Sequence, residues 1–244
     1  MKKLLIATCL SATLLTTGCV DTGLSAGTDF LKAATMTDED AIALAAAAKK
    51  EMDASNDVAP AKNKYAKRLA KITKGLENED GLNLDFKVYL VEDINAFAMA
   101  DGTVRVYSGL MDILTDDEIR FVIGHEVGHV KLGHSKKAAQ VAYASSGVQK
   151  GAAAAGGKVG ALSQSQLGNF ANKLVNSQFS QSQETDADTY AVKFMKRHGW
   201  DPKAGIGVMK KFQQMEAEAG GSGHSVFSSH PASDDREEHI RDLL

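Results

Sequence analysis

The chain has 244 residues, of which 43% are hydrophobic and 24% are charged, and its formal net charge is -3. This composition is that of an ordinary globular protein, and its slightly acidic balance offers no basic surface for a nucleic-acid partner. The two cysteines are Cys9 and Cys19. Because Cys9 lies in a predicted signal peptide, the mature chain is expected to have no internal disulfide.

Residues 1–18 have the pattern of a secretory signal peptide. Two lysines precede an apolar stretch at residues 4–15, which is too short for a permanent transmembrane helix of roughly 20 apolar residues. Cys19 follows Thr-Thr-Gly, as in a bacterial lipobox, although Thr16 stands where leucine is usual. We therefore expect a lipid anchor at Cys19, the alternative being ordinary cleavage that leaves a stray thiol. In enterobacterial lipoproteins, aspartate directly after the lipidated cysteine favours retention at the inner membrane. Because Val20 stands at this position, we expect the periplasmic face of the outer membrane.

A tether and two helices are expected next. Residues 19–36 are small, polar and aperiodic, which is typical of a flexible tether, and residues 37–244 form the predicted domain. Thr37 and the three acidic residues after it form a good helix start. A second amphipathic helix is indicated by apolar residues at helical spacing, namely Tyr65, Leu69, Ile72 and Leu76.

The pattern then changes to strands. Residues 86–91 (FKVYLV) are a strand candidate, and residues 95–109 predict a hairpin because Asp101-Gly102 is a favoured two-residue turn. Thr115 and Glu118 form a capping box, so a helix should begin at about Asp116.

The second half of the chain is expected to be mostly helical. Residues 144–168 are rich in Gly, Ala, Ser and Gln, and form either a flexible connection or a mobile helical hairpin over a cleft. A helix is predicted from Leu167 to Gly199, and a final one over residues 234–244. The fold class is therefore α+β, predominantly helical with one small β-sheet.

The sequence HEVGH within the predicted helix indicates a metal site. His125 and His129 are one helical turn apart, so both imidazoles can reach one ion. Glu126 can hydrogen-bond a metal-bound water without being a ligand. Gly124 and Gly128 each cost the helix about 1 kcal/mol relative to alanine, so we expect another element to pack closely there.

The third ligand is expected from a different helix. His134 is one residue short of the metzincin spacing and would lie on the opposite side of a continuous helix from His125, which favours a structural role or a place at the helix end. In ETDAD, Glu184 can ligate while Asp188 accepts the outward N–H of a ligand histidine. ETDAD alone would be read as a solvated acidic face; paired with HEVGH, it predicts the ligand set His125, His129 and Glu184.

Four segments together resemble one metallopeptidase family. HEVGH, ETDAD, SSHPASDDR (228–236) and NAFAMADGTVRVYSGLM (95–111) are similar to motifs of the gluzincin family that includes the HtpX heat-shock protease, the Oma-type protease and the CAAX prenyl protease. The resemblance runs from about residue 60 to the end and implies a zincin-like fold. The chain lacks the transmembrane helices of the HtpX branch.

The resemblance implies further roles. His230 and Arg236 match family positions near the active site, where either could stabilise the oxyanion of the tetrahedral intermediate. His230 could instead occupy the open zinc position in a resting state or only shape a turn with its proline, and Arg236 could be exposed on the last helix. Asn95, Ala96 and Phe97 resemble the substrate-side strand, which binds an extended peptide by adding it to the sheet; a hairpin that only packs on the helix is equally compatible.

These residues predict a zinc-dependent endopeptidase. Two histidines and one carboxylate leave Zn²⁺ an open position for water, and Glu126 would act as the general base. Zinc is the expected metal for this donor set. The resemblance implies a lipid-anchored envelope enzyme that cleaves unfolded or misassembled polypeptides, with possible assembly or protease partners. The alternatives are a silent chaperone whose site is closed by His230, and a small-molecule metallohydrolase.

Overall fold

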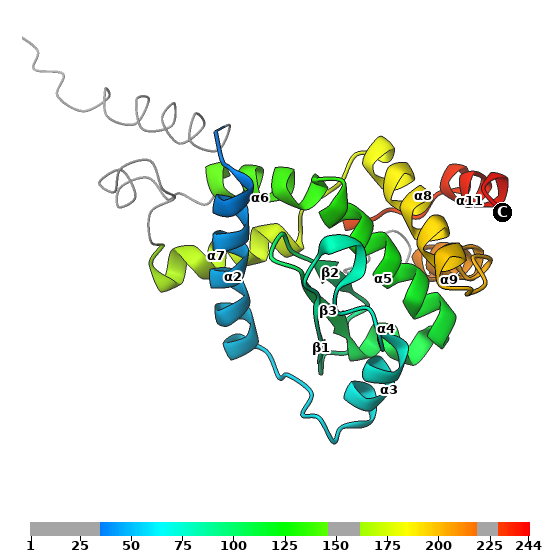
Figure 1. The fold of residues 1–244 in the computed structure, drawn as a ribbon, viewed down its shortest axis with the longest axis horizontal. Helices are drawn as coiled ribbons and strands as arrows, with labels where there is room; N and C mark the ends of the chain where they lie inside the picture. Colours follow the sequence, from blue (N-terminus) through cyan, green and yellow to red (C-terminus); the bar gives the residue numbers. More distant parts are fainter. Residues whose placement is uncertain (1–34, 146–161, 219–228) are drawn as a thin grey trace, which may run out of the picture.

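A mixed three-stranded sheet separates two groups of helices in the computed structural model, which describes residues 35–145, 162–218 and 229–244 (Figure 1). Strand β1 (Asp85–Tyr89) pairs in parallel with β3 (Thr103–Tyr107), and β2 (Ala96–Ala98) pairs antiparallel with β3. The order β1-β3-β2 makes β2 an edge strand. The predicted hairpin is confirmed, but its loop has three residues, 100–102, instead of the predicted two, because Met99 N–H donates to the carbonyl of Thr103. Gly102 ends this loop with φ +83°, which suits glycine.

Alternate residues of each strand belong to two different cores. Val104 and Val106 of β3 lie in the larger core, whereas Phe97 of β2 and Tyr89 of β1 lie in a second, smaller core. This division follows from the two-residue period of a strand, which points successive side chains to opposite faces. Each face of the sheet therefore has its own set of helices.

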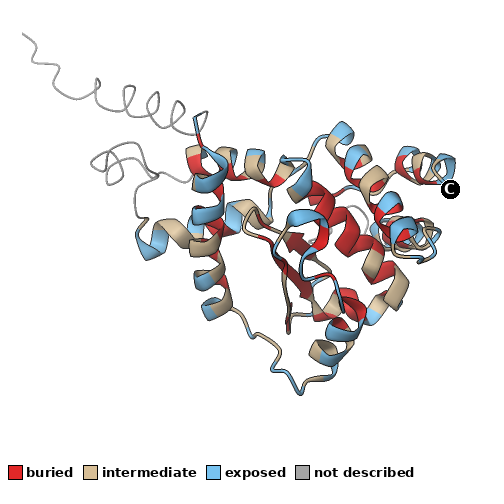
Figure 2. Cartoon of the chain, viewed as in Figure 1, coloured by how far each residue is buried: buried red, intermediate tan, exposed pale blue. Residues whose placement is uncertain are grey.

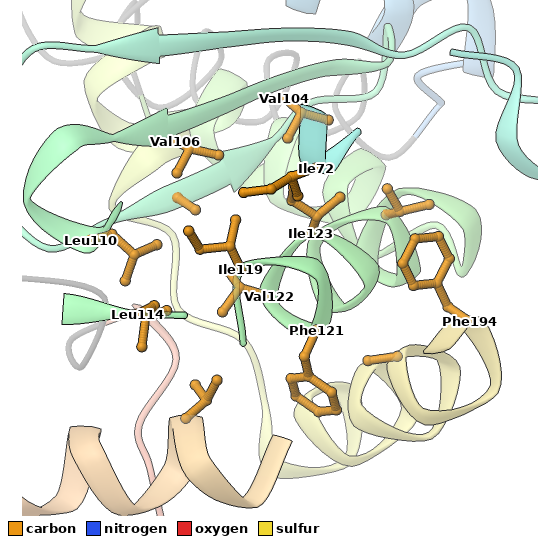
Figure 3. Close-up of a cluster of buried hydrophobic side chains, with 14 of the residues drawn as sticks. Ile72, Val104, Val106, Leu110, Leu114, Ile119, Phe121, Val122, Ile123 and Phe194 are labelled. Carbon is orange, nitrogen blue, oxygen red and sulfur yellow. The ribbon is translucent and has the colours of Figure 1, made fainter. Parts of the chain in front are cut away.

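The larger core is built around helix α5 (Asp116–Lys131) (Figure 3). Apolar side chains of α5 such as Ile119 and Ile123 pack against the sheet, and Phe194 approaches α5 from a neighbouring helix. The other helices of this side are α3 (Lys64–Ile72), α4 (Ser108–Ile113), α8 (Gln181–Arg197), α9 (Ala204–Glu218) and α11 (Asp234–Asp242). A short 3-10 turn, η1 (Glu79–Gly81), precedes β1.

Three helices cover the opposite face of the sheet. They are α2 (Asp38–Ser55), α6 (His134–Ser145) and α7 (Gln164–Val175), and they lie together on one side of the strands in Figure 1. Their small buried residues, many of them alanines, form the second core with aromatic side chains of the sheet. The capping box predicted at Thr37 is present, with Asp40 as its partner.

A buried polar network ties α2 to the sheet. The side chain of Arg105 in β3 has no exposed surface and donates two hydrogen bonds to Asp53 of α2, at 2.9 and 3.0 Å. Tyr89 and Lys87 donate to the same carboxylate, each at 2.8 Å. Burial alone would raise the pKa of Asp53, but these donors lower it to about 2. The α2 layer is thus attached through a charge pair as well as through apolar contacts.

Two expectations from the sequence are corrected. The single helix predicted from Leu167 to Gly199 is two helices, because Ser180 caps α8 and forms a capping box with Gln183. Met36, assigned to the tether, is only 4% exposed and belongs to the second core. Helix α9 was not predicted, although its buried residues Val208 and Phe212 are four apart.

Other expectations concern the part of the chain outside the described residues. These are the signal peptide, the lipid anchor at Cys19, the tether up to residue 34, and most of the segment 144–168. Of that segment, the last residues form the start of α7. Among the described helices none is both long enough and apolar enough to cross a membrane. The α+β fold class with one small sheet is confirmed.

Candidate metal centre

Helix α5 begins where its capping box predicts. Thr115 is the N-cap, its side chain accepts from the N–H of Glu118, and Glu118 accepts from the N–H of Thr115 at 2.7 Å. This start places His125, Glu126 and His129 in the second half of the helix, all of them at most 5% exposed. Figure 2 shows this stretch of α5 as buried. The polar motif therefore lies inside the protein and not on a solvated helix face.

Helix α8 brings a carboxylate to these histidines. Glu184 lies with one oxygen 3.5 Å from His125 Nε2 and the other 3.4 Å from His129 Nε2. His230, from the segment before α11, places Nδ1 2.8 Å from Glu184 Oε1 and 3.3 Å from His125 Nε2. The two Nε2 atoms of His125 and His129 are 3.0 Å apart. Four donor atoms thus surround one point, all within 4.8 Å of one another.

This arrangement fits a divalent metal ion. Ligand atoms at 2.0–2.1 Å from a tetrahedral ion are separated by about 3.3 Å, which is close to the 3.0–3.5 Å between the ligand atoms of His125, His129 and Glu184. The charge also fits: among the described residues at the centre, the buried carboxylates of Glu126, Glu184 and Asp188 face one buried guanidinium, Arg236. Buried charges need compensation, and a divalent cation would balance the excess.

The outward nitrogen of His125 is held by a carboxylate. Asp188 Oδ1 lies 2.9 Å from His125 Nδ1, so a neutral imidazole donates its Nδ1 proton and leaves Nε2 free to ligate. Burial alone would lower the pKa of His125, but the charges of Glu184 and Asp188 raise it to about 10 when no metal is present. Metal binding would therefore displace a proton from this cluster.

Arg236 lies beneath the carboxylates. Its Nε and Nη2 atoms each donate to Asp188 at 2.7 Å, and Nη1 donates to the carbonyl of Pro231. Nη1 also forms an ion pair with Glu184 Oε2, and the two atoms are 2.7 Å apart. Within the described part of the chain, this oxygen accepts no hydrogen bond. Arg236 is 7% exposed, so the alternative of an exposed arginine is wrong. Its contacts suit a residue that positions Asp188 and Glu184.

His134 and Phe179 adjoin the second histidine ligand, and sequence reasoning missed both contacts. Helix α5 ends at Lys131, and Gly133, with φ +77°, turns the chain so that His134 Nδ1 lies 3.1 Å from His129 Nδ1. Phe179, between α7 and α8, stacks on His129 with ring centroids 3.9 Å apart. On a continuous helix, His134 would lie on the opposite side from His125, but the helix ends before it. No sequence pattern around Phe179 indicates a metal centre.

Glu126 is placed for proton transfer. Burial raises the pKa of Glu126, partly opposed by the positive charges of His230 and His125 and by a hydrogen bond from the N–H of Ala98. One oxygen of Glu126 lies 3.7 Å from His230 Nε2. The carboxylate is thus next to the ligand cluster and is not one of its four members.

The edge strand runs beside this carboxylate. The carbonyl of Asn95 accepts from the N–H of Tyr107, and the N–H of Met99 donates to the carbonyl of Thr103, so the backbone groups of the residues between them alternate in direction. Ala96 and Ala98 therefore direct their N–H and C=O away from β3, whereas Phe97 directs them toward it and buries its ring. Of the three predicted substrate-strand residues, Ala96 is the one whose backbone faces the open side.

The glycines of α5 allow α8 to approach. A Cβ atom on Gly124 would lie 2.5 Å from Cδ1 of Phe194, and one on Gly128 would lie 3.1 Å from Cβ of Tyr190. The close packing expected at both glycines is present. It holds the helix that carries Glu184 against the helix that carries the histidines.

Comparison with known proteins agrees with the resemblance inferred from the sequence. The profile of peptidase family M48 matches residues 63–244. The chain is 46% identical to metalloprotease LoiP of Escherichia coli (strain K12), over 100% of this chain and 97% of that protein. Metalloprotease YcaL of the same strain is 43% identical over 99% of this chain and 97% of that protein. A shorter match, 42% identical over 53 residues, covers 20% of this chain and 18% of protease HtpX of Pasteurella multocida (strain Pm70).

Proposed function

Because the chain belongs to peptidase family M48 and is a metalloendopeptidase, we propose that its metal is zinc and that it cleaves extended stretches of unfolded polypeptide. The observation that carries the proposal is the donor set on two packed helices, two imidazoles from α5 and a carboxylate from α8. Imidazole and carboxylate ligands with a further open position are typical of catalytic zinc.

His125, His129 and Glu184 would hold the ion. When bound, zinc would polarise the peptide carbonyl and lower the pKa of a water molecule. Glu126 takes a proton from the attacking water and returns it to the nitrogen of the departing amine. Its raised pKa suits the first of these steps, because a carboxylate that is more basic than usual accepts the proton more readily. Asp188 keeps the proton of His125 on Nδ1, and Arg236 keeps Asp188 in place.

His230 occupies the fourth position of the donor cluster. We interpret this as the resting arrangement, in which the imidazole stands where water and the substrate carbonyl must bind. His230 lies next to Glu126. Once it has left the fourth ligand position, a His230 that stays near Glu126 could donate a hydrogen bond to the oxyanion. A chaperone with a permanently closed site is a weaker proposal, because the full-length relatives bear the name metalloprotease.

The substrate would bind along the open side of β2. An extended peptide added next to Ala96 gains main-chain hydrogen bonds that depend little on its sequence. This mode suits unfolded chains, whose backbones are accessible. The signal-peptide pattern and Cys19 support a lipid-anchored enzyme at the periplasmic face of the outer membrane. At this location, unfolded substrates would be damaged or misassembled envelope proteins.

The test compares the purified protein with Glu126→Gln on an unfolded substrate such as casein, with bound metal quantified in both. We expect the wild type to cleave, the variant to lose at least about 100-fold in rate, and both to retain about one zinc per chain. Glu216→Gln is the matched control, since Glu216 is exposed on α9. Equal cleavage by Glu126→Gln and wild type would refute the general-base role, and zinc retention without cleavage by wild type would favour a closed site.

A further inference from the structure

A cavity lies on the face of the sheet that α2 and α7 cover, and it extends to the residue next to His230 of the metal centre. It has a volume of about 450 Å³ and is open on one side; it is lined by α2, α7, the residues that lead into β2, Tyr107 at the end of β3, and Ser229, the neighbour of His230. Figure 1 shows α2 and α7 on this side of the strands. Pockets that bind small molecules have volumes of roughly 300–1,000 Å³, so this cavity is large enough for a long side chain.

The lining of this cavity is polar and acidic. Two carboxylates, Glu51 and Asp93, contribute to it together with amide side chains, and none of its described lining residues is Lys or Arg. The amides are those of Asn56, Asn95, Asn172 and Asn176. Tyr107 adds a hydroxyl, and burial together with the negative charge of Asp93 raises its pKa, so the hydroxyl stays neutral. Carboxylates with amide and hydroxyl oxygens are acceptors suited to a cation that carries several N–H groups.

The strand register connects the cavity to a bound peptide. Asn95 and Tyr107 are directly opposite, with Tyr107 N–H donating to Asn95 C=O at 2.9 Å, and both line the cavity. Side chains of directly paired residues share one face of a sheet. A peptide residue that pairs with Asn95 on the open side of β2 would extend this row and direct its side chain to the cavity, whichever direction the peptide runs.

The distance from the reacting bond follows from the same register. The N–H of Ala98 reaches Glu126, and Asn95 is three residues earlier in the chain. At about 3.3 Å per residue, the cavity is reached about 10 Å along the strand from the catalytic carboxylate. A side chain that enters it belongs to a residue about two to four positions from the cleaved bond.

We propose that this acidic cavity is a specificity subsite that binds a lysine or arginine side chain of the extended substrate. The inference rests on the proposed function and defines it further: backbone pairing at β2 supplies general affinity, and the cavity selects peptides with a basic residue at one fixed distance from the bond that is cut. Glu51 and Asp93 are its charged groups.

The test maps cleavage sites in a mixture of peptides and then measures kcat/KM for peptides that carry Lys, Gln or Glu at the position identified. We expect basic residues to be enriched at one position two to four residues from the cut, with Lys favoured over Gln by about fivefold. The Lys-to-Gln ratio should fall to about one in the double variant Glu51→Gln, Asp93→Asn. Glu39→Gln, an exposed position on the same helix, should keep the ratio.

The outcomes separate the two proposals. If wild type cleaves peptides without a positional preference for basic residues, or if the double variant keeps that preference with an unchanged melting temperature, the subsite is refuted and the peptidase assignment stands. If wild type cleaves no peptide although it holds zinc, the proposed function fails and the subsite with it.

Discussion

At the residue scale, the outward nitrogens of the two histidine ligands have unlike partners. His125 donates to Asp188, a carboxylate held by Arg236, whereas His129 Nδ1 lies 3.1 Å from His134 Nδ1. For His129 to ligate through Nε2, its Nδ1 must carry the proton, and His134 must accept it with the neutral nitrogen. His134 is thus a positioning residue for His129, supported by the turn at Gly133.

Replacing His134 should therefore weaken metal binding. We expect His134→Ala to lower zinc affinity about tenfold, because the orientation of His129 is no longer fixed. His134→Asn should restore most of the affinity, since its amide oxygen can accept in place of the imidazole nitrogen. Competition with a chromogenic chelator measures both constants; equal affinities for His134→Ala and wild type would exclude the positioning role.

At the scale of elements, the centre depends on the contact between α5 and α8. The histidines and Glu184 are on different helices, and Gly124 and Gly128 set how near these helices come. The neighbours differ: Phe194 has no exposed surface, whereas Tyr190 is partly exposed and has room to shift. The same substitution should thus have different effects at the two glycines.

We expect Gly124→Ala to destabilise the fold by about 1–2 kcal/mol, because overlap with Phe194 costs more than the helix gains from alanine. It should also lower zinc affinity, since α8 carries Glu184. Gly128→Ala is the matched variant and should be near neutral in stability. Urea unfolding and zinc titration of both proteins check this; a stability loss at Gly128 equal to that at Gly124 would contradict the packing explanation.

At the scale of the whole molecule, the sheet lies between two layers of helices that contribute different sites. The α5 side holds the metal centre, and the α2 side contributes the acidic cavity and is attached through Asp53 and Arg105. The pKa of Asp53 is lowered to about 2 from an ordinary 3.8. Its charged form therefore stabilises the fold above about pH 4, and this contribution is lost as the pH falls through 2.

Asp53→Asn should reduce the free energy of unfolding by about 2 kcal/mol at pH 6, from the shift of nearly two units in a carboxyl that is only 19% exposed. The difference from wild type should shrink as the pH is lowered from about 4 to 2. Asp57→Asn removes the same charge at an exposed position and serves as the control. A wild-type advantage that is independent of pH over this range would contradict the assigned cause.

The sequence by itself determined the features that depend on neighbours within a few residues. The start of α5 follows from Thr115 and Glu118, the hairpin from Asp101-Gly102, and the shared face of His125 and His129 from helical periodicity. The helix that carries Glu184 could also be predicted, because ETDAD matches a family motif that accompanies HEVGH. Local hydrogen bonds and periodic side-chain directions are present in the sequence pattern before the chain is packed.

Only the tertiary structure decided how these elements meet. The pairing of Arg236 with Asp188 and the cavity beyond Asn95 depend on contacts between segments distant in the chain. The capping box that begins α8 and the turn at Gly133 are local, but the contact of His134 with His129 became evident only from the structure. Their geometry is set by helix packing and by the layer that each strand residue faces. Such contacts leave no periodic signal, so they become visible only when the core is assembled.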